Sequence, residues 1–321
     1  MKKFDVIVVG ELNVDLILSD IPVFPELGKE ILAEEMNLVL GSSSAIFASN
    51  LSSLGAKTAF IGKVGNDDFG QFVVNCLEQK GIDTSHVVRD ERLKTGITII
   101  LNYPDDRAMV THAGAMEKLT IDDINWDFVN GSRHLHLSSF YLQKGMRKSC
   151  PTLFKQAKNN GLSTSFDTNW DPDETWGADI FDVLPHVDVF LPNEHEAQFI
   201  SGRQTPEAAL DKLTEYSKTT VIKRGAKGAV AKQNGKMFEA APFKVTPVDA
   251  VGAGDSFDAG FVFKYLQGKD ITKCLEFGNM CGALSVTKAG GTAAFENSDQ
   301  IARDMTRLFG QSVDLSVDLS K

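Results

Sequence analysis

The chain has 321 residues, of which 42% are hydrophobic and 24% are charged, and this composition is typical of a globular protein. Its formal net charge of −10 argues against nucleic acid as the main partner, because an acidic surface repels phosphate backbones. The four cysteines form no C-x-x-C pair and no apolar run is long enough to span a bilayer, so we expect a cytoplasmic protein with buried thiols, no zinc or redox motif and no membrane partner.

The first segment predicts a buried strand followed by a half-polar one. The apolar run from Val6 to Val9 ends at Gly10, which is typical of a strand in a parallel sheet. Beyond it, Asn13 and Asp15 alternate with apolar residues, so their side chains share one face of a strand. From this alternation alone, a solvent-facing strand is the simpler interpretation. A site for a polyol is the alternative, because an amide and a carboxylate can donate to and accept from neighbouring hydroxyls.

Further strands are predicted outside the regular alternation of strands and helices. A proline-containing loop at 22–25 precedes a strand-like segment at 31–40. The segments 96–101 and 108–111 flank Pro104-Asp105-Asp106, which predicts a hairpin.

A capped helix is predicted between Gly41 and Gly55. The serines after Gly41 supply the N-cap, and Gly55 stops the helix. A stripe of Phe47, Leu51 and Leu54 supplies its buried face.

The segment 65–70 has the glycine spacing of a P-loop and leads into a predicted helix at 72–77. However, Gln71 occupies the position of the P-loop lysine, and without that cation the β- and γ-phosphates lose their main partner. We therefore exclude a P-loop here.

From residue 133 onward the chain alternates between strand and helix. Strand-like segments at 133–137 and 162–166 enclose a helical stretch at 146–160. Asn169 follows the second strand, and ligands of open parallel sheets bind at such carboxyl ends.

Two later motifs have both a structural and a functional interpretation. After a strand at 187–192, Asn193 and Glu196 have the spacing of a capping box. Gly225 and Gly228 lie in a turn between two strand segments, which predicts a plain hairpin as readily as a loop that approaches a nucleotide.

The C-terminal third contains a glycine-rich turn that leads into a helix. Gly252, Ala253 and Gly254 precede Asp255, and backbone N–H groups of such a turn form an anion hole with the helix dipole. A carboxylate beside it can accept the proton of a hydroxyl that attacks a phosphoryl group. A simple turn and helix cap would use the same residues. A helix of small residues that ends at glycine is predicted at 277–291.

These segments resemble, in the same order, those of the ribokinase-like (PfkB) family of sugar and nucleoside kinases. The resemblance covers the chain from Gly10 to Gly291. The stretch from Asp249 to Asp255 is similar to the family signature Asp-Thr-x-Gly-Ala-Gly-Asp and departs from it only at Ala250.

The 41–55 helix resembles a second signature of the family, Gly-Gly-x-x-x-Asn-x-Ala-x-x-Leu-x-x-Leu-Gly. Ser42 replaces its second glycine and Ile46 its asparagine, two positions that touch the sugar in family members. Because isoleucine cannot hydrogen-bond, at least one hydroxyl contact of a typical ribokinase is missing or supplied elsewhere. No lysine or arginine lies in this helix, which argues against a phosphorylated acceptor.

The resemblance implies an α/β fold, a ribokinase-like three-layer sandwich with a mainly parallel central sheet and a small β-sheet lid. The expected core comprises residues 1–10, 41–91 and 114–310, the lid residues 11–40 and 92–113, and the C-terminal tail residues 311–321. A lid suits the chemistry, because phosphoryl transfer must exclude water.

The resemblance also implies functions for residues in four groups. Asp255 is the expected catalytic base, beside an anion hole of Gly252, Ala253 and Gly254. The expected acceptor site contains Asn13, Asp15, Gly41, Ser42, Ile46 and Asn169. The expected nucleotide site contains Asn193, Glu196, Lys223, Gly225, Lys227, Gly228 and Asn279, and the expected monovalent cation site contains Asp249, Val251, Ser285, Lys288 and Gly290.

The implied reaction is transfer of the γ-phosphate of ATP to a hydroxyl of a small unphosphorylated sugar, ribose- or fructose-like. Mg²⁺ bridges the phosphates in such a reaction, and K⁺ is an expected further cofactor. A homodimer through the lid is an expectation from the family alone.

Three other functions remain open. A nucleoside kinase would use Ile46 and the Phe140-Tyr141 pair to line a base pocket. A 2-keto-3-deoxy sugar acid kinase is disfavoured, because the arginine that family members carry two residues after Asn169 is either replaced by Asp171 or shifted. A non-catalytic sugar-sensing protein is expected to lack the base, and Asp255 is present.

Overall fold

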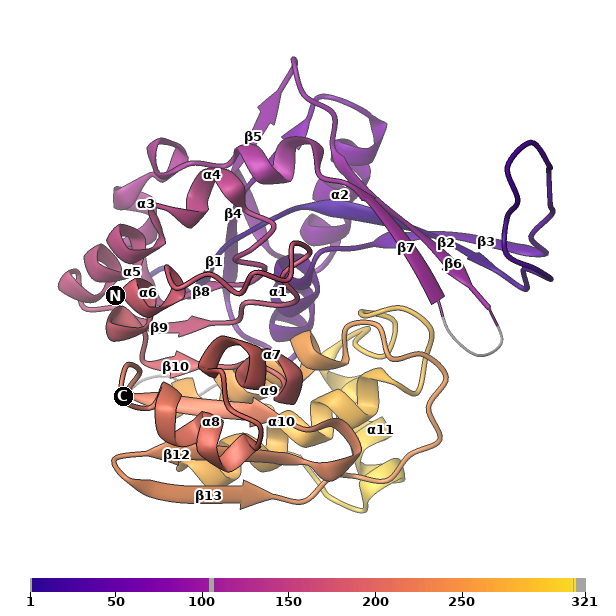
Figure 1. Cartoon of the computed structure of the whole chain (residues 1–321). Helices are drawn as coiled ribbons and strands as arrows, with labels where there is room; N and C mark the ends of the chain where they lie inside the picture. The colour runs from indigo at the N-terminus through magenta and orange to yellow at the C-terminus, as the bar shows by residue number, and fades with distance from the viewer. Residues whose placement is uncertain (1, 104–106, 314, 316–321) are drawn as a thin grey trace.

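The computed structural model describes residues 2–103, 107–313 and 315. Among these residues, nine strands form a central sheet in the order β13-β12-β11-β10-β9-β8-β1-β4-β5 (Figure 1). In this order, the strands β11-β10-β9-β8-β1-β4-β5 pair in parallel, and β12 and β13 at one edge are antiparallel. This confirms the predicted, mainly parallel sheet. Its strands are β1 (Phe4–Val9), β4 (Thr58–Gly65), β5 (Asp83–Asp90), β8 (Ser132–Leu137), β9 (Ser163–Phe166), β10 (Val189–Phe190), β11 (Thr219–Lys223), β12 (Ala229–Gln233) and β13 (Lys236–Ala240).

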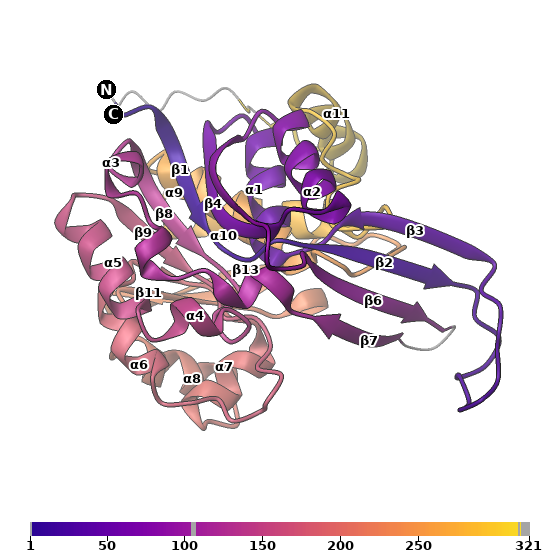
Figure 2. The same ribbon diagram turned by 90° about the horizontal axis from the view of Figure 1, so that it is seen from above.

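Helices cover both faces of this sheet, as Figure 2 shows from above. One core cluster involves α1 (Ser43–Ser53), α2 (Asp68–Gln79), α9 (Ala253–Leu266), α10 (Ile271–Ser285) and α11 (Ser298–Phe309). The other involves α3 (Trp126–Val129), α4 (Lys144–Arg147), α5 (Cys150–Asn159), α6 (Ile180–Val183), α7 (Glu194–Ser201) and α8 (Pro206–Leu213). Short 3-10 turns complete the described elements: η1 (Gly114–Lys118), η2 (Ile121–Asp123), η3 (Leu184–His186) and η4 (Gly225–Lys227). All six residues of β1 are buried because both faces of its sheet are covered.

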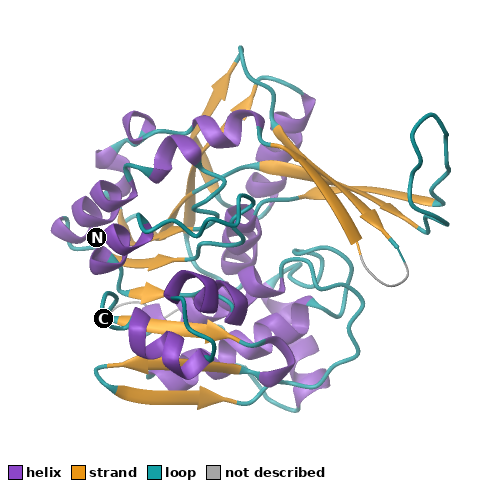
Figure 3. Ribbon diagram, viewed as in Figure 1, coloured by secondary structure: helices purple, strands orange, loops and turns teal. Residues whose placement is uncertain are grey.

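A second sheet projects from the body beyond the helices (Figure 3). Its described strands follow the order β3-β2-β6-β7, with β2 and β6 parallel and the outer pairs antiparallel. This confirms the predicted lid, although its turn at Pro104-Asp105-Asp106 lies outside the described residues. The strands are β2 (Asn13–Ser19), β3 (Glu35–Leu40), β6 (Gly96–Asn102) and β7 (Arg107–His112).

Two predicted helices have different bounds in the structure. The stretch at 146–160 is divided into α4 and α5, and Pro151 lies in the first turn of α5, where its missing N–H costs no hydrogen bond. The helix predicted to reach residue 291 ends at Ser285. Its end is fixed because the N–H and hydroxyl of Thr287 both donate to the Leu284 carbonyl, at 3.1 and 2.7 Å.

The glycine-rich segment at 65–70 connects the lid to the core through hydrogen bonds of Asp67. Asp67 caps α2 by accepting a hydrogen bond from the Gly70 N–H at 2.9 Å. Its carboxylate also accepts from the N–H and the hydroxyl of Thr95, at 2.9 and 2.6 Å, immediately before lid strand β6. The segment therefore has a structural role, in agreement with the exclusion of a P-loop.

The cysteines are free thiols that are buried or partly buried, as the composition predicts. Of the four, Cys150, Cys274 and Cys281 are buried and Cys76 is partly buried. Within the described part of the chain, no helix has both the length and the apolar character needed to cross a bilayer.

Candidate active site

Two helix N-termini and three strand ends meet at one place. Glu11 follows β1 and accepts a hydrogen bond at 3.1 Å from the N–H of Ser44 in the first turn of α1. Lys223, the last residue of β11, lies 2.8 Å from Asp167, which follows β9, and 3.0 Å from Asp258 of α9. Parallel strands end at the same edge of the sheet, which is why residues so far apart in sequence converge here.

The anion hole lies at the start of α9. Gly252 has a left-handed backbone (φ 72°), which glycine adopts without strain, and α9 begins at the next residue. Among the described residues, the N–H groups of Gly252 and Gly254 have no protein acceptor, whereas the Ala253 N–H donates to the Ala250 carbonyl at 3.3 Å. Two of the three N–H groups of the predicted hole are therefore open, and Ala253 is only partly available as a donor; that they bind an anion stays a prediction.

Side-chain hydrogen bonds hold this turn in place. Asn50 of α1 donates to the Ser256 hydroxyl and to the Gly291 carbonyl, each at 2.9 Å. Ser256 in turn donates to the Gly252 carbonyl at 2.7 Å. These contacts fix the turn relative to α1, so that the open N–H groups keep one orientation.

Asp255 lies in the first turn of α9 and is only 7% exposed. Burial raises its pKa to about 7, chiefly because a desolvated carboxylate is unfavourable. The charge of Lys223 opposes this increase, and the charges of Asp167 and Glu11 add to it. A carboxylate with a pKa near neutrality suits a general base.

Lys223 lies in a buried cluster of opposite charges beneath the anion hole. Its ammonium contacts one oxygen of Asp167 at 2.8 Å and both oxygens of Asp258 at 3.0 and 3.2 Å. Burial alone would lower the pKa of Lys223, but the neighbouring carboxylates hold it above its ordinary value. A methyl group added at Gly254 would lie 3.5 Å from the Lys223 Nζ, which places this positive charge directly below the helix start.

Asn13 and Asp15 lie side by side on lid strand β2, as their alternation predicts. The Asn13 Nδ2 donates to the Asp15 carboxylate at 3.0 Å, and both side chains are buried rather than solvent-facing. Burial raises the pKa of Asp15 to about 6, while Asn13 and the charge of Arg107 lower it. The carboxylate and the amide therefore lie together, as the polyol interpretation requires.

Gly41 lies against this pair, and we expect Gly41→Ala to disrupt it. The added methyl would lie 2.3 Å from the Asp15 Oδ1 and 2.7 Å from the Asn13 Nδ2, so both groups must move. The KM for the acceptor should rise by roughly tenfold or more, the effect of losing a charge-assisted hydrogen bond. Gly131→Ala is the matched control. Its added methyl would lie 3.0 Å from the Phe128 carbonyl oxygen, and its other near neighbours are carbon atoms. An unchanged acceptor KM in Gly41→Ala would argue against this acceptor site.

Ser42 takes the position of a family glycine and keeps its backbone conformation. Its φ of 71° is unfavourable for a serine. Two hydrogen bonds offset this strain: the Ser42 hydroxyl donates to the Glu11 carbonyl at 2.6 Å and accepts from the Ala45 N–H at 3.0 Å. The predicted serine N-cap of α1 is therefore confirmed.

Ile46, the second departure from the signature, packs beneath the anion hole. A methyl group at Gly291 would lie 2.6 Å from its Cδ1, and one at Gly252 would lie 3.1 Å from its Cγ2. The side chain is almost fully buried and supports the turn. Its contact with an acceptor stays a prediction.

Asn193 and Glu196 form the capping box that their spacing predicts. The Asn193 Oδ1 accepts from the Glu196 N–H at 2.9 Å, and the Glu196 carboxylate accepts from the Asn193 N–H at 2.8 Å. Burial raises the pKa of Glu196 to about 8, and the charge of Asp167 adds to the increase. Lys223 pairs with Asn193 through a backbone bridge, so the capping box adjoins the buried charges.

The loop expected to approach the nucleotide lies between β11 and β12. Gly225 and Gly228 both have positive φ, as the turn requires. The Lys227 ammonium is exposed and lies 3.3 Å from Glu194. Of the two lysines considered for phosphate, Lys223 lies at the buried centre and Lys227 at the surface.

Asn279 lies in the middle of α10 with its amide nitrogen already bonded. The Nδ2 donates to the carbonyls of Ala240 and Ala241, at 3.0 Å each. Its Oδ1 is therefore the atom left for a ligand, and it can only accept a hydrogen bond.

The segments expected to bind a monovalent cation lie together. One Asp249 oxygen accepts from the Val251 N–H at 2.9 Å, and the other accepts from the Gly290 N–H at 2.8 Å. The Ser285 hydroxyl is buried without a partner among the described atoms. The Lys288 ammonium bonds Glu296, so only its carbonyl is left for this site. In the described residues, no cluster of three acidic, histidine or cysteine side chains suggests a different metal site.

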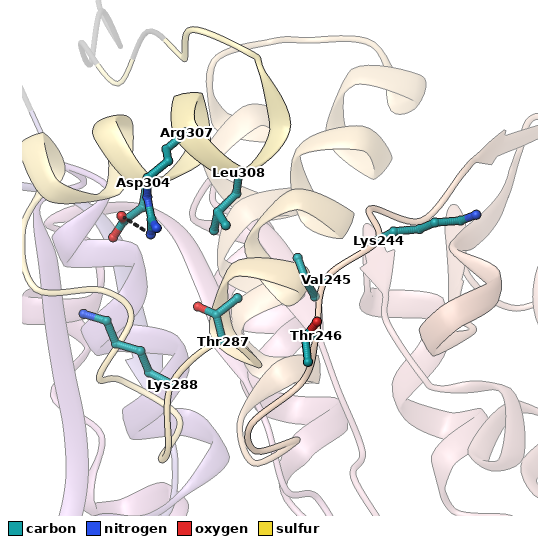
Figure 4. Close-up of a pocket in the computed structure, with 8 residues that line it drawn as sticks. All are labelled: Lys244, Val245, Thr246, Thr287, Lys288, Asp304, Arg307 and Leu308. Atoms are coloured by element: carbon teal, nitrogen blue, oxygen red, sulfur yellow. Dashed lines mark hydrogen bonds and ion pairs between the residues drawn. The ribbon is translucent and has the colours of Figure 1, made fainter.

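A cavity of about 610 Å³ lies on the other side of the 287–288 turn, against α11. Figure 4 shows Arg307 bonded to Asp304 across one wall and Lys244 extended away from the other lining residues. Apart from Lys288, its lining residues are not among the predicted site residues. It is distinct from the centre at Asp255.

Four side chains at that centre are absent from the expectations based on sequence: Glu11, Ser139, Asp167 and Asp258. The hydroxyls of Ser44 and Ser139 donate to Glu11, at 2.5 and 2.9 Å. Two sequence signals point to these residues in retrospect. Glu11 directly follows the end of a buried strand, and Asp258 is a charge within an apolar helical run.

The base pocket expected at the Phe140-Tyr141 pair is wrong. Both rings are buried in the core, with Phe140 against Phe166 at 5.5 Å and Tyr141 against Trp176 at 5.5 Å between ring centroids. Edge-to-face packing of this kind stabilises the core, and it leaves no ring face for a nucleobase.

Comparisons with known proteins agree with this geometry. The model of the pfkB family of carbohydrate kinases matches residues 3–298. A 5-dehydro-2-deoxygluconokinase of Clostridium perfringens is 30% identical over 303 residues, which cover 89% of this chain and 88% of that protein. The solved ribokinase of Thermotoga maritima superposes with a TM-score of 0.82 at 25% identity, over 95% of this chain and 99% of that one. An E. coli chain solved in complex with ATP and Mg²⁺ superposes with a TM-score of 0.83 at 25% identity and the same coverage. The chain therefore belongs to the pfkB family of carbohydrate kinases, ATP-dependent phosphotransferases that act on an alcohol group.

Proposed function

We propose that this kinase transfers the γ-phosphate of ATP to a hydroxyl of a small unphosphorylated sugar, ribose- or fructose-like, with Asp255 as the base. The observation that carries the proposal is the position of Asp255. Its carboxylate is buried, has a pKa near neutrality and stands beside the open N–H groups of Gly252 and Gly254. A base and an anion hole so close together serve a hydroxyl that attacks a phosphoryl group.

Each group at this centre has a part in the proposed reaction. Asn13 and Asp15 orient the acceptor through its hydroxyls, and Asn169 contacts it from the end of β9. Asp255 takes the proton of the attacking hydroxyl. The N–H groups of Gly252 and Gly254, with Ala253, stabilise charge on the transferring group, and one such donor contributes about 3–4 kcal/mol in other enzymes. The proposed acceptor site is completed by Gly41, Ser42 and Ile46.

The proposed nucleotide site extends from the anion hole toward β12 and α10. Lys223 supplies positive charge below the phosphates, and the Asn279 Oδ1 accepts from the adenine amine. Mg²⁺ bound to the phosphates would neutralise charge that develops on them. The related E. coli chain was solved with ATP and Mg²⁺, which supports this assignment. The other proposed contacts are Asn193, Glu196, Gly225, Lys227 and Gly228.

We also propose a K⁺ site between the loops that Asp249 joins. The unpartnered Ser285 hydroxyl fits a cation held by oxygen atoms, because such an atom otherwise remains unsatisfied. The proposed ligands are Asp249, Val251, Ser285, Lys288 and Gly290, mostly through main-chain carbonyls.

A sugar acid is the second candidate acceptor. The charge of Arg107 on lid strand β7 lowers the pKa of Asp15, so a cation lies within electrostatic range of the proposed acceptor residues. A substrate carboxylate would bind such a cation. The 30% identical relative from Clostridium perfringens is a 5-dehydro-2-deoxygluconokinase, which adds support.

We also propose that the protein is cytoplasmic and that it forms a homodimer through the lid. Large apolar side chains of its two edge strands are exposed, with Met36 65%, Met109 58% and Val110 64% exposed. Surfaces of this kind favour association.

The direct test is ADP production with Mg·ATP and K⁺ over a panel of ribose, fructose, other hexoses, sugar acids and nucleosides. One sugar should give turnover well above the ATP hydrolysis seen without acceptor. A sugar acid as the only active acceptor would select the second candidate. Turnover with nucleosides alone would contradict the proposal. So would the absence of turnover with every acceptor of the panel in a protein that still binds ATP.

The activity should depend on pH through Asp255. Its pKa is raised to about 7, and only the ionised carboxylate accepts a proton, so activity is lost as pH falls through that value. We expect kcat/KM to fall about tenfold per pH unit below about pH 7 and to level off above it. Initial rates measured from about pH 5 to about pH 9 test this. A profile that is flat through neutrality would contradict a base with this pKa.

A further inference from the structure

One continuous line of hydrogen bonds connects two buried histidines and three serines on the central sheet. The Ser163 hydroxyl of β9 lies 2.8 Å from the His134 Nδ1 of β8, and the His134 Nε2 lies 2.7 Å from the Ser165 hydroxyl. The same hydroxyl lies 2.7 Å from the His136 Nδ1, whose ring contacts the Ser138 hydroxyl through Nε2 at 2.6 Å. We call these five residues the histidine–serine line, and none of them has a part in the proposed reaction.

The line extends from a partly exposed end to the candidate active site. Ser163 is partly exposed, whereas both histidines are fully buried. At the other end, Ser138 directly precedes Ser139. The Ser139 hydroxyl donates to the Glu11 carboxylate, and its backbone N–H donates to the Asn169 Oδ1, both at 2.9 Å. The line therefore supports the segment that holds two polar side chains of that site.

Packing connects the same line to α1. The His136 ring is stacked on the buried Phe47 ring, with 3.7 Å between ring centroids and 15° between ring planes. The first residue of that helix, Ser43, accepts a hydrogen bond from the Asn169 Nδ2 at 2.9 Å. His136 is thus the point where β8, β9 and α1 meet.

The positions of the protons along the line follow from its two ends. A neutral imidazole has one N–H and one lone pair, and a hydroxyl has one proton, so the direction of one bond fixes all the others. Among the described residues, the Ser138 hydroxyl has no acceptor except the His136 Nε2, so it donates there. At the far end, the Ser163 hydroxyl donates to the Arg133 carbonyl at 3.5 Å, so it accepts from the His134 Nδ1. Both ends give the same direction, with each ring protonated at Nδ1.

The surroundings of the line keep both rings neutral. Burial lowers the pKa of His134 to about 3, although the charge of Asp188 opposes this decrease. Burial also lowers the pKa of His136 well below its ordinary value, and the charges of His134 and Lys223 add to this effect. Tyr265 of α9 lies 6.3 Å from His134 between ring centroids, and it stays uncharged because burial raises its pKa to about 12. In the described part of the chain, no carboxylate is hydrogen-bonded to either ring, so a positive charge there would lack a direct partner.

A proton taken up by either ring changes the bond at Ser138. On His136 the proton would occupy Nε2, and this N–H would face the Ser138 hydroxyl, whose own proton then loses its acceptor. On His134 it would also occupy Nε2 and turn the Ser165 proton toward the His136 Nδ1. That ring must then carry its own proton at Nε2, with the same result at Ser138. A buried donor without an acceptor and a buried charge without a partner are both unfavourable.

We propose that the histidine–serine line is an acid-sensitive connection: with both rings neutral and protonated at Nδ1 it joins β8, β9 and the Ser138–Ser139 segment, and a proton on either ring breaks it. The inference depends on neither ATP nor an acceptor. A histidine whose pKa is lowered by folding contributes its full stability above about pH 6.5, the value in the unfolded chain, and loses it as the pH falls. For each ring, the unfolding equilibrium constant should rise up to about tenfold per pH unit below that value.

The first experiment uses the wild-type, full-length protein labelled with 15N. At neutral pH the imidazole nitrogens of His134 and His136 should show the Nδ1–H tautomer in NMR spectra, and both rings should remain neutral down to about pH 4. The two signals are assigned by their disappearance in His134→Gln and His136→Gln. A proton at Nε2 in either neutral ring, or protonation of either ring with a midpoint near pH 6.5 in the folded protein, would overturn the proposal.

Denaturant unfolding between about pH 4 and pH 8 gives the second readout. His136→Gln keeps a hydrogen-bonding side chain that cannot be protonated, so the wild type should lose stability relative to this variant by up to about tenfold in the unfolding constant per pH unit below about pH 6.5. The comparison cancels the contribution of buried carboxylates such as Glu11, whose raised pKa acts in the opposite direction. His195→Gln is the matched control, because His195 is exposed on α7 and the variant should follow the wild type at every pH. A constant difference between wild type and His136→Gln across this range would indicate packing alone and refute the acid-sensitive connection.

Discussion

Asp255→Asn is expected to bind ATP normally and to lose nearly all turnover. The amide has the size of the carboxylate but cannot accept the acceptor proton, so the loss should be that of a general base, about 10²- to 10⁴-fold in kcat. Asp255 is buried with its pKa raised, so removal of its charge should not destabilise the fold. ADP release gives kcat, and titration calorimetry gives the affinity for ATP.

The matched control for this variant is Asp68→Asn. Asp68 also lies in the first turn of a helix, but it is exposed and outside the site. Its kcat should equal that of the wild type. Near-normal kcat in Asp255→Asn, measured beside this control, would refute Asp255 as the base.

Lys223→Met is expected to cause the largest loss of stability among single changes at this centre. Methionine leaves Asp167 and Asp258 buried without the ammonium that contacts both, at 2.8 and 3.0 Å. Removal of one partner of a buried ion pair typically costs about 3–5 kcal/mol of unfolding free energy. Denaturant unfolding followed by circular dichroism measures this cost.

A second variant separates charge from packing at Lys223. Lys223→Met combined with Asp258→Asn removes one unpaired charge, so it should be more stable than Lys223→Met alone. Lys273→Met is the surface control, because Lys273 pairs with Glu276 at 2.7 Å in solvent and should contribute almost nothing. If the double variant is less stable than Lys223→Met, charge compensation is not the function of this lysine.

The local determinants of this protein are visible in its sequence. The start of α9, with Gly252 as a left-handed cap and Asp255 in the first turn, follows from a short run of small residues before an apolar helix. The Asn193–Glu196 capping box and the serine cap of α1 follow in the same way. Each depends on residues three or four positions apart, and hydrogen bonds at that range are set by helix geometry.

Strand periodicity likewise predicts that Asn13 and Asp15 share a face, but not that the face is buried. The lid and the body enclose it, and this burial raises the pKa of Asp15. The same limit explains the error at Phe140 and Tyr141. Their composition suits a base pocket, and only the packing of Phe166 and Trp176 against them shows that they belong to the core.

The tertiary structure alone decides which polar groups meet. Lys223, Asp167 and Asp258 come from two strand ends and a helix, and Ser139, Asn169 and Ser43 from two strand ends and another helix. Neither set has a spacing in the sequence, because parallel strands place residues from distant segments at one sheet edge. The sequence by itself therefore determined the local structure of the proposed catalytic motif and the fold class. The charges that adjust the proton affinity of Asp255 come together only when the strands are aligned, since they act through distances of a few ångströms in space.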